Sequence, residues 1–102
     1  MSSEKLIQGV LPIGTSTIYS IPSVGGLAKV YYIKFYNPVA YDITLSRYQS
    51  TISSTLDLYS LNLAAGDSIT DSSSYLLSEF DELKVTTSVA GTSYFIYLYS
   101  SI

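Results

Sequence analysis

The chain has no histidine and no cysteine among its 102 residues. Nucleophilic arrangements of the Ser–His and Cys–His kinds are therefore excluded, and acid–base chemistry would fall on carboxylates or tyrosine. Zinc and copper sites lack their usual ligands, and no disulfide framework can form. We therefore expect a protein that is not an enzyme, with no cofactor and no assigned catalytic or metal-binding residues.

Charged residues are also scarce, at 13% of the chain against a usual share of about 25%. The net charge is −3, and the five basic residues are scattered along the sequence, namely Lys5, Lys29, Lys34, Arg47 and Lys84. A nucleic-acid partner is not expected, because phosphate backbones are bound by clustered Lys and Arg. Such a chain depends on its many Ser and Thr hydroxyls for solubility, or it spends little time as a free monomer.

Targeting and membrane signals are missing as well. The N-terminus has no basic stretch followed by an apolar run, which is the pattern of a signal peptide. No apolar window approaches the roughly 18–20 residues that span a bilayer. We expect no membrane partner, and a protein made and used in a cytoplasm-like space or released without a secretion signal.

Acidic residues gather in two places, at 79–82 and at the pair Asp67 and Asp71. Carboxylate oxygens of this kind bind Ca²⁺, but neither place matches an EF-hand loop. A glycosidase would need two carboxylates that flank a cleft, and a chain this short leaves little material for one. We interpret these acids as turn-forming and solubilising residues.

Strand signals dominate what is present. Residues Tyr, Ile, Val and Thr form short runs that are separated by Gly, Pro, Asn, Asp and Ser. The predicted strands are 16–21, 28–36, 41–48, 56–63, 67–70, 75–77, 82–87 and 92–100, with a polar loop at 49–55. A short helix over 74–83 is the alternative for that segment, because Leu76, Leu77, Phe80 and Leu83 have helical spacing.

This pattern predicts an all-β fold, a single antiparallel β-sandwich (jelly-roll-like) of about seven or eight short strands. The sandwich domain is expected to span 15–102. Residues 1–14 are expected as an N-terminal arm before the core, in which 9–13 could pair as an edge strand.

Two predicted strands are apolar on both faces. In 30–36, Tyr31, Ile33 and Phe35 alternate with Val30, Tyr32, Lys34 and Tyr36, and in 94–99, Tyr94, Ile96 and Leu98 alternate with Phe95, Tyr97 and Tyr99. A two-layer sandwich buries one face of each strand, so the second face must pack on something else. We predict a subunit interface made by Tyr32, Tyr36, Phe95, Tyr97 and Tyr99. The alternative is that tyrosine lies on exposed strands because of its β-propensity alone.

The order of motifs resembles a small β-domain that recurs in virion proteins of tailed bacteriophages. The motifs are Thr-Ile-Tyr-Ser-Ile-Pro at 17–22, the long strand that ends at Asn37, the strand at 41–45, Leu-Asn-Leu-Ala-Ala-Gly-Asp-Ser-Ile at 61–69 and Asp-Glu-Leu-Lys-Val-Thr-Thr-Ser at 81–88. They cover about four-fifths of the chain. The sequence departs from the pattern after Pro22, where Ser-Val-Gly-Gly-Leu-Ala-Lys replaces the usual Gly-Lys. The resemblance implies a structural domain, usually oligomeric, with no catalytic residues to transfer.

The function expected from this resemblance is a structural component of a bacteriophage virion, assembled in the host cytoplasm. It would be an accessory head-surface protein, such as a capsid decoration protein or head-fibre subunit, that forms a homo-oligomer (dimer or trimer). Its arm would dock onto another virion protein such as the capsid shell through Leu6, Ile7, Val10, Leu11 and Ile13. The alternatives are a tail or baseplate component, and a module that binds host glycans; sugar-binding sites usually favour tryptophan, which this chain lacks.

Overall fold

The computed structural model describes residues 3–101, which form nine antiparallel strands and no helix. The strands are β1 (Ser3–Leu11), β2 (Gly14–Ser20), β3 (Ala28–Tyr36), β4 (Tyr41–Gln49), β5 (Ser54–Leu63), β6 (Ser68–Asp71), β7 (Tyr75–Leu77), β8 (Glu82–Thr87) and β9 (Thr92–Ser100). Accordingly, the described residues contain no helix long and apolar enough to cross a membrane.

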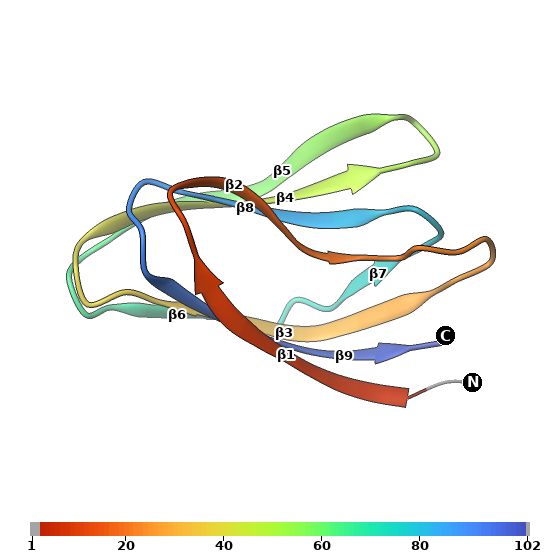
Figure 1. The fold of residues 1–102 in the computed structure, drawn as a ribbon, viewed down its shortest axis with the longest axis horizontal. Helices are drawn as coiled ribbons and strands as arrows, with labels where there is room; N and C mark the ends of the chain where they lie inside the picture. The colour runs from red at the N-terminus through yellow and green to blue at the C-terminus, as the bar shows by residue number, and fades with distance from the viewer. Residues whose placement is uncertain (1–2, 102) are drawn as a thin grey trace.

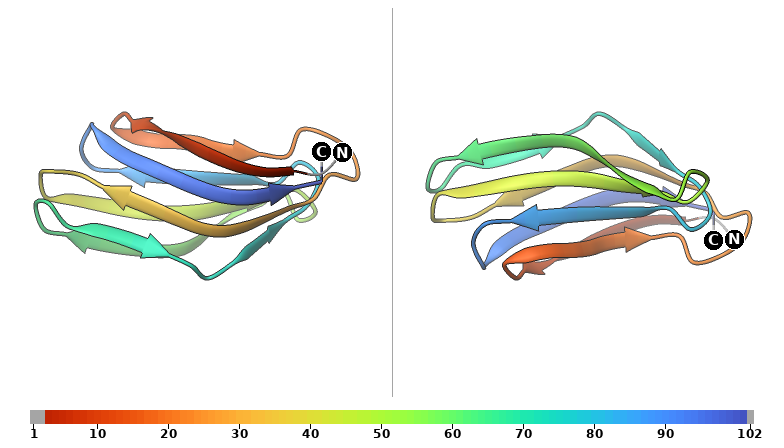
Figure 2. Two further views of the ribbon diagram at one scale, coloured as in Figure 1. Left: turned by 90° about the horizontal axis from the view of Figure 1, so that it is seen from below. Right: turned by 90° about the horizontal axis from the view of Figure 1, so that it is seen from above.

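The strands form two sheets that stack as a sandwich (Figure 1). Sheet A has the order β1-β9-β3-β6, and β7 also pairs with β3; sheet B has the order β2-β8-β4-β5. Figure 2 shows sheet A facing the viewer on the left and sheet B facing the viewer on the right. The predicted all-β sandwich is confirmed.

The main difference from the prediction lies at the N-terminus. Strand β1 pairs with β9 over nine consecutive residues, from Ser3 opposite Ser100 to Leu11 opposite Thr92. An edge strand was expected at 9–13, and pairing is observed over a longer stretch that begins at Ser3. Residues 3–11 of the expected arm therefore belong to sheet A, because Ile7 and Leu11 alternate onto its inner side and pack on the core.

The helical alternative for 74–83 is not adopted. Ser74 and Phe80 have positive φ angles of 56° and 62°, and a right-handed helix cannot continue through either residue. The segment instead contains β7 and a turn that leads into β8. The loop expected at 49–55 is shorter, because β4 continues to Gln49 and β5 begins at Ser54.

The core lies between the two sheets and follows the two-residue period of the strands. Its fully buried side chains come from both layers, with Val30, Ile33, Phe35, Ile96 and Leu98 from sheet A and Ile43, Leu45, Leu83 and Val85 from sheet B.

A bulge in β3 changes one predicted face. The register with β9 shifts between Val30 and Tyr32, so that Tyr31 is an extra residue. Val30, which was predicted to share a face with Tyr32, is fully buried in the core instead. Because a bulge lets two neighbouring residues point to the same side, Tyr31 and Tyr32 both lie on the outer face of sheet A.

Truncation of a central core side chain tests this packing. We expect Phe35→Ala to lower the free energy of unfolding by about 3–5 kcal/mol, because it removes a fully buried ring and leaves a cavity. The control is Val24→Ala in the β2–β3 turn, where the side chain is 78% exposed and the expected change is within about 0.5 kcal/mol. Urea unfolding at fixed protein concentration measures both, and equal effects would contradict the assigned core.

Candidate assembly surface

The two sheets present very different outer faces. The outer face of sheet B carries pairs of polar side chains that hydrogen-bond across neighbouring strands. The Oγ1 atoms of Thr15 and Thr86 lie 2.7 Å apart, and Thr44 Oγ1 lies 2.6 Å from Ser60 Oγ. Ser46 donates to Asp57 over 2.8 Å. These polar groups satisfy one another, which is typical of a solvent-exposed face.

The outer face of sheet A is aromatic at its centre. The ring of Tyr31 lies 5.5 Å from that of Tyr97, and Tyr32 stacks between Phe95 at 5.8 Å and Tyr97 at 5.9 Å. These four residues come from the adjacent strands β3 and β9, and all are half-buried. Contacts of this kind contribute about 0.5–1.5 kcal/mol each beyond the area they bury.

Apolar side chains extend this cluster in both directions. On β1, Leu6 lies opposite Tyr97 and Val10 opposite Ser93, and their side chains are 56% and 70% exposed. Tyr36 and Tyr99 are each 40% exposed on the same side. We call this surface the aromatic face, defined by Leu6, Val10, Tyr31, Tyr32, Tyr36, Phe95, Tyr97 and Tyr99.

The structure thus brings together two sets of residues that the sequence suggested separately. All five predicted interface residues, Tyr32, Tyr36, Phe95, Tyr97 and Tyr99, lie on the aromatic face. Leu6 and Val10, which were predicted to dock a partner from a separate arm, lie beside them on β1. Tyr31 was missed, because the strict alternation of a regular strand places it inward and the bulge was not foreseen.

Two of the arm residues are placed differently from the prediction. The Leu11 side chain is only 4% exposed, and Ile7 packs against the same core. They are therefore used by the domain itself and are not free to contact a partner. Ile13, in the turn between β1 and β2, is 66% exposed.

An open groove of about 940 Å³ crosses the aromatic face. Its apolar lining includes Val10, Tyr32, Tyr36 and Phe95, and its polar lining includes Gln8, Lys34, Ser68 and Ser93. The described residues that line it include no carboxylate.

A side-chain hydrogen bond also links β1 to the centre of this face. The Tyr97 hydroxyl donates to Glu4 Oε2 over 2.7 Å, and this bond raises the pKa of Tyr97. On the other side of the cluster, the Lys29 ammonium lies 5.5 Å from the centre of the Tyr31 ring. A face with few charges and many tyrosines has the composition of the buried centre of a protein–protein interface.

A second apolar depression, of about 470 Å³, lies at the end of the sandwich near the C-terminus. Leu27 and Leu76 line it and are 58% and 68% exposed. Lys29, Arg47 and Tyr99 line it as well. No sequence pattern predicts this depression, because its residues come from distant segments.

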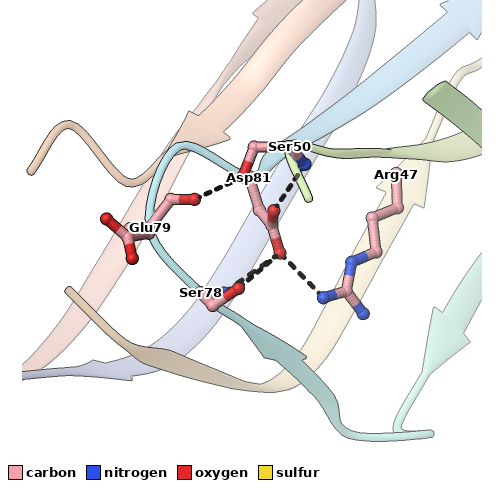
Figure 3. A network of polar contacts seen from close by, with 5 residues as sticks. All are labelled: Arg47, Ser50, Ser78, Glu79 and Asp81. Atoms are coloured by element: carbon pink, nitrogen blue, oxygen red, sulfur yellow. Dashed lines mark hydrogen bonds and ion pairs between the residues drawn. The ribbon is translucent and has the colours of Figure 1, made fainter. Parts of the chain in front are cut away.

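The acidic segment 79–82 has a structural role in this fold. Asp81 is fully buried, and its carboxylate accepts hydrogen bonds from the Ser50 amide at 2.9 Å and the Ser78 amide at 3.1 Å. Arg47 Nη2 donates over 2.8 Å, and the Ser78 hydroxyl also donates. Ser50 in turn donates to the Glu79 carbonyl oxygen (Figure 3). Asp81 therefore fixes the β4–β5 turn to the β7–β8 turn.

In the other acidic pair, Asp71 also has a structural role. Asp71 accepts hydrogen bonds from the Ser73 amide and from the Tyr75 hydroxyl. Among residues 3–101, no three carboxylates come close enough together to hold a metal ion.

Known proteins share the fold of this chain, but no family is shown. No protein-family model matches the chain, and no match was found among curated proteins. Among solved structures, the fold is similar to that of Bacillus endospore appendages, described as a family of disulfide-linked pili. The TM-score is 0.61 at 18% identity, over 98% of this chain and 85% of that one.

The fold is also similar to that in the acidic stable capsid structure of Helicobacter pylori bacteriophage KHP30. Here the TM-score is 0.58 at 17% identity, over 98% of this chain and 93% of that one. At this level of identity the likeness shows a shared fold.

The buried carboxylate of Asp81 makes the stability of the fold depend on pH. Burial by itself would raise the pKa of Asp81, but the hydrogen bonds from Ser50, Arg47 and Ser78 and the positive charge of Arg47 together outweigh it and lower the pKa from 3.8 to about 2. Since the folded pKa lies below the unfolded one, the stabilisation is present above pH 4 and is lost as the pH falls toward 2. It corresponds to about 2 kcal/mol.

We expect Asp81→Asn to lower the unfolding free energy by about 2 kcal/mol or more at pH 7, because an amide offers one acceptor where the carboxylate offers two. The difference from the unmodified chain should shrink as the pH falls from about 5 to about 2. Urea titrations across this range measure it. The control is Asp42→Asn on an exposed part of β4; a difference for Asp81→Asn that stays constant with pH would contradict the assignment.

Proposed function

We propose that this chain is a structural subunit that assembles non-covalently through the aromatic face. The observation that carries the proposal is the contrast between the two outer faces of one sandwich. The face of sheet B satisfies its own polar groups, whereas the face of sheet A exposes stacked tyrosines, Leu6 and Val10. Contiguous apolar surface of this kind marks interaction sites on soluble proteins.

The size of the face supports this proposal. Strands of nine residues extend about 30 Å, and neighbouring strands lie about 4.8 Å apart. The aromatic face spans the three strands β1, β9 and β3 and therefore covers on the order of 400 Å² per copy, even when treated as flat. Two such faces together give about 800–900 Å², close to the roughly 1,000 Å² that is the lower limit for a specific interface.

A virion is the assembly that two observations favour. The motif order resembles tailed-phage virion domains, and the fold is similar to that in a bacteriophage capsid structure. The finer proposal is an accessory protein of the head surface, a decoration protein or head-fibre subunit, that is a dimer or trimer and contacts the capsid shell. Of the docking residues first suggested, Leu6, Val10 and Ile13 remain exposed for such contacts.

The likeness to disulfide-linked pili does not extend to their chemistry, since this chain has no cysteine. Any assembly of this chain is therefore held without disulfide bonds.

The groove favours one second candidate, a glycan-binding module. Tyr32, Tyr36 and Phe95 offer rings on which sugars stack, and Gln8, Lys34 and Ser93 offer polar groups beside them. Under this alternative the groove stays open in the assembled protein. If the protein is monomeric and binds a glycan saturably, and if Tyr36→Ala abolishes that binding, the glycan-binding function would be favoured over assembly.

A charge placed on the aromatic face tests the main proposal. We expect Tyr97→Glu to weaken self-association by about thirtyfold or more, because a buried hot-spot tyrosine is replaced by a charge that would lie beside Glu4. Thr44→Glu on the outer face of sheet B is the matched control and should leave association unchanged. Sedimentation at several concentrations measures both, with circular dichroism to confirm folding; a Tyr97→Glu chain that assembles like the control would refute the proposal.

A further inference from the structure

Four sheet edges remain in this sandwich, at β1 and at β6 with β7 in sheet A, and at β2 and β5 in sheet B. An edge strand presents unpaired backbone N–H and C=O groups, onto which another strand can add. Soluble proteins protect such edges with short strands, bulges, proline or charges. The four edges differ in how well they are protected.

Three of the edges are protected. Strands β6 and β7 have only four and three residues. Strand β2 shifts register between Thr17 and Tyr19, which leaves Ile18 as an extra residue. Strand β5 shifts in the same way, because Leu45 pairs with Tyr59 and Ser46 with Asp57, so that Leu58 is extra. Each feature interrupts the regular row of donors and acceptors that a new strand would need.

Strand β1 is neither short nor bulged, and its two charged residues, Glu4 and Lys5, lie near one end. Its nine residues pair with β9 without any shift in register, and Pro12 follows only after its end. Lys5 is the one charge that alternation places on the inner side, and it lies near one end of the strand. The segment from Leu6 to Leu11 is therefore a regular free edge.

We propose that β1 pairs antiparallel with β1 of a second copy of this chain, about a two-fold axis at Gln8. In this register Leu6 of each copy lies opposite Val10 of the other, and Ile7 lies opposite Gly9. Directly opposed residues share a face and contact each other, so the two most exposed apolar side chains of the strand cover one another.

The sequence of β1 selects this register over its neighbours. An axis at Ile7 would place Leu6 opposite Gln8 and Glu4 opposite Val10, and an axis at Gly9 would place Val10 opposite Gln8 and Leu6 opposite Pro12. Neither axis lets Leu6 and Val10 cover one another, as the axis at Gln8 does; there Pro12 falls opposite Glu4, at the end of the paired segment. A shift by one residue would bring inner and outer faces together. The pattern Leu6-x-Gln8-x-Val10 is symmetric about its centre, as a two-fold contact between identical strands requires.

Pairing of this kind goes beyond the proposed use of the aromatic face, because it engages the edge of sheet A and not its surface. It would join two copies of sheet A into one continuous sheet and place their aromatic faces side by side. The combined face would be twice as wide as that of one copy.

Because the chain has no cysteine, single cysteine substitutions test the register directly. Opposed Cβ atoms in such a pair are about 4.5–5.5 Å apart, within reach of mild oxidation or a short bis-maleimide. We expect Gln8→Cys to cross-link into dimers about tenfold faster or more than Thr44→Cys on sheet B, because pairing raises the local thiol concentration. Leu6→Cys and Val10→Cys should cross-link slowly alone and quickly when mixed with each other.

Two results with the single-cysteine chains would overturn the proposal. One is a Gln8→Cys chain that cross-links no faster than Thr44→Cys; the other is a mixture of Leu6→Cys and Val10→Cys that gains nothing over either alone. Repeating Gln8→Cys together with Tyr97→Glu separates the two surfaces. Cross-linking that persists there supports the edge contact even if the aromatic face fails as an interface, and cross-linking that disappears assigns the contact to the face and refutes the edge.

Discussion

Everything distinctive about this protein depends on the burial of alternate side chains of β3 and β9 between two sheets. Ile33, Phe35, Ile96 and Leu98 are fully buried, and their burial fixes which neighbours point outward. Those neighbours are aromatic, so the same two strands build the core on one side and an exposed ring cluster on the other. A sandwich with polar residues at these outer positions would be complete alone; this one leaves a large apolar face uncovered.

The sequence reveals a good part of this arrangement. Eight strands follow from the two-residue period and from turn residues such as Pro22 and Asn37. The same period predicts the outward-facing aromatic residues of β3 and β9. The bulge at Tyr31 and the start of β1 at Ser3 do not follow, because both are set by pairing with β9, which is distant in the chain. The role of Asp81 was missed for the same reason, since its partners Arg47 and Ser50 come from another turn. The role of Asn37 could not be predicted either, because its buried side-chain amide donates to the Ala90 carbonyl and the Thr92 hydroxyl, which are distant in sequence.

The polar chemistry of the described residues serves the fold. Asp81 and Asn37 each tie together turns or strands that are far apart in sequence, whereas Asp71 bonds locally to Ser73 and Tyr75. The surfaces for which we propose a role in assembly are the aromatic face and the free edge of β1. Both lie on sheet A and adjoin one another, which concentrates the capacity for assembly on one side of the sandwich.

The central claim is that copies of this chain assemble with one another through sheet A, and the mass of the unmodified chain in solution tests it most directly. Light scattering at micromolar concentration should give a dimer, a trimer or a larger multiple of the 11.1 kDa chain. The mass should fall toward that of one chain on dilution. A monomer at every concentration would contradict the account and leave the aromatic face for a different partner.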